Sequence, residues 1–115
     1  LITKNNKKMK NLNVQNMTGS NGNVIANQFI ISYNSKFKNT ESQIKTSQID
    51  VFQSYDSIIA KKIHKGWNTE IILDKNTWDY SRTTGKYRNI FLGESKIETK
   101  KKIKSKEYKL MDLNK

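Results

Sequence analysis

The spacing of apolar residues changes near Trp78, and this change constrains the fold more than any other feature of the chain. Before it, the apolar segments are short and rich in β-branched and aromatic residues, which is typical of strands. After it, Tyr87, Ile90 and Phe91 are spaced i, i+3 and i+4, which places them on one face of a helix. Strands followed by helices predict an α+β fold.

Four segments carry the strand pattern, at residues 28–33, 49–55, 57–63 and 69–74. The last two flank residues 64–68, where Gly66 supplies turn flexibility, so they predict a hairpin. The polar residues 34–47 are expected to form an extended hairpin connection, and residues 18–23 are expected to form a loop. We therefore predict a small antiparallel sheet of about four strands.

Local capping signals define the helices that follow. Ser81 or Thr83 can cap the start of the first helix, and Gly93 stands where a C-terminal glycine would end it. Residues 95–98 have the spacing of a capping box, which predicts a second helix running to about Lys104. We expect one or two C-terminal helices to pack on one face of the sheet. A short extended segment then ties the C-terminus to the core through Tyr108, Leu110 and Leu113.

Length and composition fit one domain. At 115 residues the chain is large enough for a modest core without a metal or a disulfide. We assign residues 1–17 to a basic, flexible N-terminal tail and residues 18–115 to a single α+β domain. Cysteine is absent, which excludes a disulfide framework, a thiol nucleophile and a Cys-based zinc site. Because no apolar run approaches the roughly 18 residues of a membrane-spanning helix, we expect no membrane partner.

The chain carries a formal net charge of +12, supplied by 20 lysines and only two arginines. Residues 1–48 hold seven Lys against one acidic residue, and residues 95–115 hold eight Lys against three. Basic ends of this kind suit the phosphate backbone of a nucleic acid. However, Lys, Asn and Ile make up 48 of the 115 residues, as an AT-rich genome would produce. A solvated surface of biased composition therefore stays open as the alternative.

Both arginines lie between Trp78 and Ser95, where hydroxyls, a glycine and cations gather at a predicted helix start. Free N–H groups and the helix dipole make such a start attractive to anions. The alternative is that the threonines only cap the helix, while the arginines pair with Asp79 and Glu94. We predict a nucleic-acid or anion site formed by Arg82, Thr83, Thr84, Lys86, Arg88, Lys100, Lys101 and Lys102.

Three aromatic residues are candidates for stacking on bases or for contact with a partner: Trp67, Trp78 and Tyr80. Proteins that bind single strands combine aromatic side chains with positive charge in this way. Trp78 and Tyr80 are expected at the corner between sheet and helices, where the alternative is packing in the core. The exposure of the rings distinguishes the two interpretations.

Signatures of catalysis are weak. His64 is the single histidine and is expected in a hairpin turn beside lysines, which disfavour both protonation and metal binding. The string TTGK at residues 83–86 resembles the end of a phosphate loop, but the motif G-x-x-x-x-G-K-[ST] is not met, because residue 80 is Tyr and Tyr87 follows the Lys. We predict no catalytic residue, no metal and no cofactor, and hence no enzyme.

Four strings of the sequence together resemble a small uncharacterised protein family common in bacteriophages and other mobile elements of low-GC bacteria. The strings are GNVIANQFIIS, FQSYDSIIA, WDYSRTTGKYRNIFLGE and ETKKKIKSKEYKLMDLN, which begin at Gly22, Phe52, Trp78 and Glu98. The resemblance covers most of residues 18–114 and brings no activity with it. In two places the sequence departs from that family: the connection at residues 34–47 is longer, as a contact arm would be, and Lys106 occupies a turn where Gly is expected.

The resemblance implies a small cytoplasmic protein of a bacterial host cell that acts without catalysis. We expect it to bind nucleic acid, or a host complex that holds nucleic acid, through its basic surface. One alternative is an anti-CRISPR-like inhibitor that binds a host defence nuclease directly, using the arm at residues 34–48 and exposed aromatics. Another is a minor virion or assembly component. The sequence leaves open whether the target is DNA, RNA or protein, and which oligomeric state the chain adopts.

Overall fold

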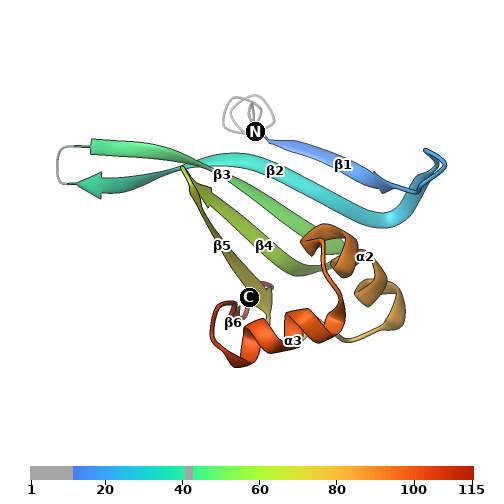
Figure 1. Cartoon of the computed structure of the whole chain (residues 1–115). Helices are drawn as coiled ribbons and strands as arrows, with labels where there is room; N and C mark the ends of the chain where they lie inside the picture. The colour runs from blue at the N-terminus through green and yellow to red at the C-terminus, as the bar shows by residue number, and fades with distance from the viewer. Residues whose placement is uncertain (1–11, 41–42) are drawn as a thin grey trace.

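The computed structural model describes residues 12–40 and 43–115. Five strands come first, two helices follow, and a short strand ends the chain (Figure 1). The elements are β1 (Asn13–Thr18), β2 (Val24–Thr40), β3 (Gln43–Ser54), β4 (Ser57–Lys65), β5 (Asn68–Asp74), α2 (Arg82–Leu92), α3 (Lys96–Lys104) and β6 (Lys109–Met111). No helix within the described residues is long and apolar enough to cross a membrane.

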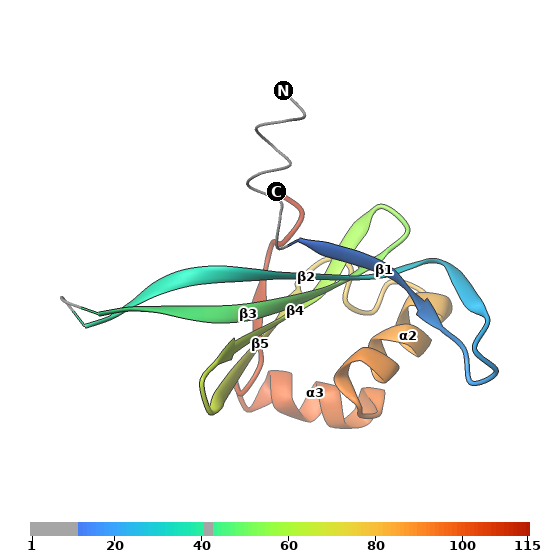
Figure 2. The ribbon, with the colours of Figure 1, turned by 90° about the horizontal axis from the view of Figure 1, so that it is seen from above.

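All six strands form one sheet whose spatial order follows the order in the sequence. The first five are antiparallel to their neighbours, and β6 pairs parallel to β5. Both helices lie in the connection from β5 to β6 and cover one face of the sheet (Figure 2). The α+β class and the two C-terminal helices are confirmed, but the sheet has six strands rather than about four.

Both additional strands have a physical explanation. Residues 13–17 were assigned to the flexible tail, yet they lie in β1, and the buried side chain of Met17 joins the hydrophobic core. Polar residues dominate β1, so its pairing with β2 and the bond from Asn16 Nδ2 to the Ile25 carbonyl oxygen (3.0 Å) hold it in place. The remainder of the predicted tail, residues 1–11, lies outside the described residues. The predicted extended segment near the C-terminus corresponds to β6.

The polar connection predicted at residues 34–47 is itself part of two long strands. Pairing between β2 and β3 continues from Asn34 and Gln48 to Thr40 and Gln43. Strand β1 reaches β2 only as far as Ser32, and β4 reaches β3 only as far as Gln48. The end of this hairpin therefore extends beyond the rest of the sheet as a two-stranded arm (Figure 1).

The core lies between the sheet and α2. Phe52, Ala60 and Leu73 are fully buried and face one another across β3, β4 and β5. Phe91 of α2 packs on Phe52 with the ring centroids 5.8 Å apart. Removing a buried Phe side chain of this kind costs about 3–5 kcal/mol, so this pair makes a large contribution to holding the helix on the sheet.

The inward face of α2 differs from the predicted one. Its buried residues are Thr84, Arg88 and Phe91, whereas the side chain of Ile90 is 57% exposed. Tyr87 lies at the edge of the core and is only partly buried. Two of the three inward positions are thus polar, and the spacing of apolar residues alone could not reveal them.

The predicted helix ends are confirmed. The Ser81 hydroxyl accepts a hydrogen bond from the backbone N–H of Thr84, and Gly93 ends α2 in the left-handed conformation with φ of 71°. Ser95 and Glu98 form the predicted capping box at the start of α3. Lys106, where Gly was expected, also has a positive φ of 67°, which a residue with a Cβ adopts at a cost.

Two buried carboxylates join parts of the chain that are distant in sequence. Asp74, at the end of β5, accepts hydrogen bonds from the backbone N–H of Asn76, Thr77 and Leu113. Glu94, between the helices, accepts from the Thr99 hydroxyl (2.6 Å), Lys102 Nζ (2.7 Å) and the Tyr108 hydroxyl (2.8 Å). Burial and the contact with Glu94 raise the pKa of Tyr108 to about 12.

Burial alone would raise the pKa of Asp74, but the hydrogen bonds from Leu113, Thr77 and Asn76 outweigh it and the pKa lies below its ordinary value. The same balance lowers the pKa of Glu94. A carboxylate whose pKa falls on folding stabilises the folded state above its ordinary pKa, and this contribution is lost as the pH falls through the folded value. The fold should therefore weaken on acidification below about pH 4.

We predict that Asp74→Asn lowers the free energy of unfolding by about 2–3 kcal/mol at pH 7, because an amide replaces one acceptor oxygen among N–H donors. The difference from the wild type should shrink as the pH falls below the ordinary pKa of an Asp, because the contribution of a carboxylate with a lowered pKa is lost on acidification. Urea unfolding at a series of pH values measures both effects. Asp56→Asn, at an exposed position, is the control, and an equal loss in both variants would contradict the prediction.

Candidate functional site: a cationic cleft at the start of α2

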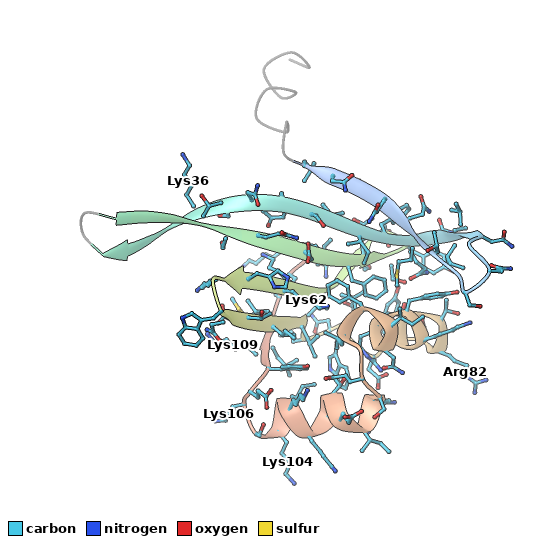
Figure 3. The ribbon with its side chains drawn as sticks, turned by 45° about the horizontal axis from the view of Figure 1, so that its top comes forward. Lys36, Lys62, Arg82, Lys104, Lys106 and Lys109 are labelled. Carbon is cyan, nitrogen blue, oxygen red and sulfur yellow. The ribbon has the colours of Figure 1, made fainter. Side chains whose placement is uncertain are left out.

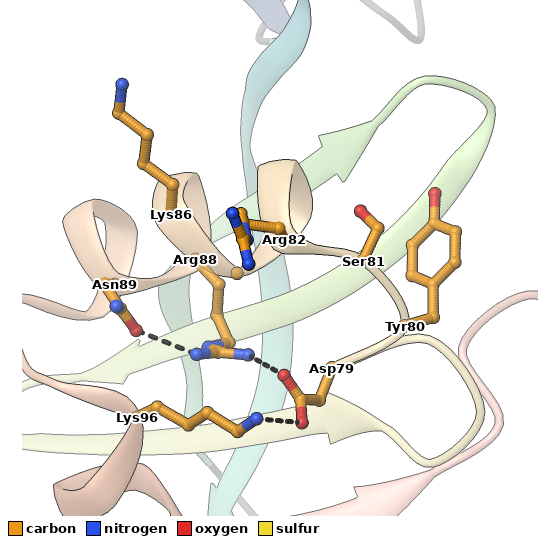
Figure 4. Close-up of a pocket in the computed structure, with 9 residues that line it drawn as sticks. Asp79, Tyr80, Ser81, Arg82, Lys86, Arg88, Asn89 and Lys96 are labelled. Carbon is orange, nitrogen blue, oxygen red and sulfur yellow. Dashed lines mark hydrogen bonds and ion pairs between the residues drawn. The ribbon is translucent and has the colours of Figure 1, made fainter.

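A cleft of about 600 Å³ opens where the chain leaves the sheet and enters α2. Its volume is in the range of small-ligand sites. Side chains from the loop before α2, from α2 itself and from the first residue of α3 surround it (Figure 4). We call it the cationic cleft; its lining residues are Asp79, Tyr80, Ser81, Arg82, Gly85, Lys86, Arg88, Asn89 and Lys96.

Arg88 forms the floor of the cationic cleft and is only 1% exposed. Its Nη1 donates to the carbonyl oxygen of Trp78 (2.7 Å) and to Asp79 Oδ1 (3.3 Å), and its Nη2 donates to Asn89 Oδ1 (2.9 Å). The guanidinium also lies 5.2 Å from the centre of the Trp78 ring. These contacts correct the prediction that Arg88 offers its charge at the surface. They match the alternative interpretation, in which an arginine pairs with Asp79.

Asp79 is the one carboxylate among the lining residues. Its Oδ1 contacts Arg88, and its Oδ2 contacts Lys96 Nζ at 2.8 Å. Burial opposes ionisation, but the hydrogen bonds from Lys96 and Arg88 outweigh it and lower the pKa of Asp79. With both oxygens engaged, Asp79 holds two cations together and neutralises only one of them.

The other cations of the cleft pair with no carboxylate in the part of the chain that the structure describes. Arg82 is exposed at the first position of α2, and Lys86 lies one turn further along, with its ammonium 5.4 Å from the Tyr87 ring centre. The first amide groups of a helix also lack intrahelical acceptors. The cationic cleft therefore has four cationic side chains against one carboxylate, beside a helix N-terminus that favours negative charge.

Gly85 lies in the helix interior, where Gly costs about 1 kcal/mol relative to Ala. The three atoms nearest to a Cβ at this position all belong to the Arg88 guanidinium, with 3.7 Å to both Nη1 and Nη2. A methyl group at residue 85 would thus lie in van der Waals contact with the guanidinium. Arg88 Nε is buried and has no hydrogen-bond partner, which is uncommon for a buried donor.

The predicted threonines differ in their surroundings. Thr84 is fully buried, and its hydroxyl lies 2.9 Å from that of Ser54 on β3. Thr83 is exposed at the start of α2. Thr84 therefore fixes the helix to the sheet, and of the two only Thr83 faces solvent beside the cleft.

The lysines of α3 divide between two faces. Lys102 points inward and pairs with Glu94 at 2.7 Å, a contact that raises the pKa of Lys102. Lys100, Lys101 and Lys104 are exposed at spacings that share the outer face of a helix. Arg82 and Lys104 both project from the helices away from the sheet (Figure 3). We define the cationic face as Arg82, Lys86, Lys96, Lys100, Lys101 and Lys104.

The three aromatic candidates lie in different places. Trp78 is partly buried and packs against the hydrophobic core, as its packing interpretation predicts. The side chain of Tyr80 is 49% exposed at the edge of the cationic cleft. Trp67 is 96% exposed in the turn between β4 and β5 and does not line the cationic cleft.

His64 lies on β4 rather than in the turn, and its position corrects the predicted surroundings. Its Nε2 contacts Asp50 Oδ2 at 3.0 Å, and its Nδ1 contacts the Thr69 hydroxyl at 3.2 Å. The cationic cleft contains none of these residues. Within residues 12–40 and 43–115, no group of three His, Asp and Glu side chains could hold a metal ion.

Sequence reasoning missed Lys96, Asn89 and Lys104. Lys96 follows the predicted N-cap Ser95, so the capping box places it at the start of α3, but its contact with Asp79 depends on the angle between the two helices. Lys104 could have been found, because it is three and four residues beyond Lys101 and Lys100. Nothing in the sequence indicated that the Asn89 amide supports Arg88.

The fold and the site define a small α+β protein with a cationic cleft formed by the loop before α2, by α2 itself and by the first residue of α3. Residues 12–109 match the model of a family of unknown function, DUF8033. Because the match covers most of the chain, the protein belongs to this family. No curated protein matches the chain, and no solved structure does.

We predict that Arg88→Ala lowers the free energy of unfolding by about 3–5 kcal/mol, because it leaves buried acceptors without their donor. Arg82→Ala, which removes an equal charge from an exposed position, should change it by less than about 0.5 kcal/mol. Thermal and urea unfolding of the two variants test the difference. Equal stability of the two would mean that Arg88 does not hold the cleft together.

Proposed function

We propose that this protein binds nucleic acid, or a host complex that holds nucleic acid, through the cationic face and without catalysis. A phage or other mobile element of a low-GC bacterium is the setting we propose for it, with the bacterial cytoplasm as its compartment. The observation that carries the proposal is the uneven distribution of charge over the folded domain. Phosphate backbones are the abundant cellular partners for such a surface.

Between Asp79 and Lys106 the chain has nine Lys and Arg residues against three acidic ones. Between Thr46 and Trp78, which form much of the sheet, it has four of each. All three carboxylates of the helical part already have partners: Asp79 in the cleft, Glu94 with Lys102, and Glu98 in the capping box. The cations of the outer surface therefore keep their charge available for a partner.

The geometry supports contact with several phosphates. The three lysines on the outer face of α3 follow one another along the helix, and Lys96 connects them to the cationic cleft. Exposed Lys and Arg side chains contact phosphates without reading bases. Tyr80 adds a partly exposed ring beside the cleft, which favours single strands because their bases are free to stack.

The arm and Trp67 support a second candidate function, direct inhibition of a host nuclease by protein contact. Among the described residues of the arm, residues 35–40 pair only with residues 43–47, and Trp67 is almost fully exposed. Exposed tryptophans are enriched among residues that dominate protein interfaces. In this case free nucleic acid would bind weakly, and Trp67→Ala would abolish binding to the nuclease while the cationic-face variants would not.

We predict that single-stranded DNA or RNA binds the wild type with an affinity that falls about a hundredfold or more between 50 and 200 mM salt. The double variant Arg82→Ala/Lys86→Ala should weaken binding at least about tenfold and reduce the salt slope by about two. Fluorescence anisotropy of labelled oligonucleotides at several salt concentrations measures both quantities.

Lys36→Ala/Lys75→Ala is the matched control, because both lysines are exposed and lie outside the cationic face. This double variant removes the same charge and should leave the affinity within about twofold of the wild type, since only screened long-range attraction is lost. Equal weakening by the two double variants would contradict a defined site. Weak binding by the wild type at the lowest salt would reject the proposed function.

A further inference from the structure

We propose that the cationic cleft binds a terminal phosphomonoester, the phosphate at the free end of a nucleic-acid strand. This inference rests on the proposed function and names the part of the nucleic acid that the cleft receives. It starts from the contrast between two regions of the cationic face. The lysines of α3 lie on an open helix surface, whereas the side chains around Arg88 surround a concave space of about 600 Å³.

Charge favours a chain end in the cleft. Arg82, Lys86, Arg88 and Lys96 surround it, and Asp79 is the single carboxylate among its lining residues. An internal phosphodiester carries one negative charge, whereas a phosphomonoester carries close to two at pH 7. Coulomb attraction to the same cations is correspondingly larger for the chain end.

The floor of the cleft is preorganised. The Trp78 carbonyl oxygen, Asp79 and Asn89 hold the Arg88 guanidinium in place, and Arg88 is 99% buried. Its Nε has no acceptor, and the space where a side chain of residue 85 would begin lies 3.7 Å from Nη1 and Nη2. The fixed charge of this guanidinium attracts a phosphate seated against Gly85, because charges in a partly buried site are screened less by salt than exposed ones.

The residues that border the cleft can also contact the nucleotide that carries the terminal phosphate. Here the loop residues Tyr80 and Ser81 border one side, and Asn89 and Lys96 border the other (Figure 4). The base next to a terminal phosphate can then stack on the exposed ring of Tyr80.

The test uses one single-stranded oligonucleotide in three forms: with a 5′-phosphate, with a 3′-phosphate, and with hydroxyls at both ends. Affinities are measured by competition against a labelled strand at about 150 mM salt, where long-range attraction is screened beyond about 8 Å. One phosphorylated form should bind about fivefold or more tightly than the hydroxyl form, because the cleft cations act at short range. The form that gains affinity identifies the end that the cleft holds.

Gly85→Ala is the decisive variant, because it places a methyl group above the guanidinium and keeps every charge. It should retain the wild-type melting temperature or raise it, since Ala favours a helix interior more than Gly does. It should lose the preference for the phosphorylated end and keep the affinity for the hydroxyl form. Lys101→Ala, on the outer face of α3, is the control and should weaken all three forms alike while keeping the preference.

Equal affinity of the three forms for the wild type overturns this inference and leaves the proposed function standing. An unchanged preference in Gly85→Ala also overturns it, because the end then binds elsewhere. Failure of every form to bind rejects the proposed function, and the inference with it.

Discussion

The buried guanidinium of Arg88 is the interaction on which the arrangement of the helices depends. It joins α2 to the loop that leaves the sheet through the Trp78 carbonyl oxygen and Asp79. Asp79 in turn holds Lys96 at the start of α3. A charge removed from water is tolerated only with close partners. The buried guanidinium therefore requires these partners to stay in place. The same contacts shape the cationic cleft, and structure and candidate site are therefore built from one set of residues.

The few carboxylates of this basic protein serve mainly as internal ties. Asp74 connects the end of β5 to the C-terminal segment, Asp79 connects the two helices to the loop, and Glu94 connects α3 to Tyr108. Each accepts hydrogen bonds that lower its pKa despite burial. Engaging the acidic groups in this way leaves the exposed Lys100, Lys101 and Lys104 without a carboxylate partner among the described residues. The positive surface is therefore partly a consequence of how the fold holds itself together.

Local chemistry made the central strands and the helix ends predictable. In each case a few neighbouring residues indicate the structure. The central strands contain β-branched residues, Ser81 and Ser95 cap the helix starts, and Gly93 ends α2. The strand β1 and the arm were missed because polar residues form them and their support comes from pairing with a distant partner. Arg88 and Lys102 were misplaced for a related reason. A cation on a helix faces inward only where Asp79 or Glu94 lies close to it. The tertiary structure, and not the local sequence, decides whether that is so.

Charge is distributed unevenly along the chain. A drift of codons toward Lys acts along the whole gene, yet positive and negative residues balance between Thr46 and Trp78 and diverge between Asp79 and Lys106. The two arginines, which such a drift does not favour, both lie in the divergent part. One of them is fixed in the floor of the cleft and the other is exposed beside it. The fold explains the buried arginine, which holds α2 to the loop, whereas the exposed Arg82 pairs with no carboxylate among the described residues, and its charge is what the proposed function would use.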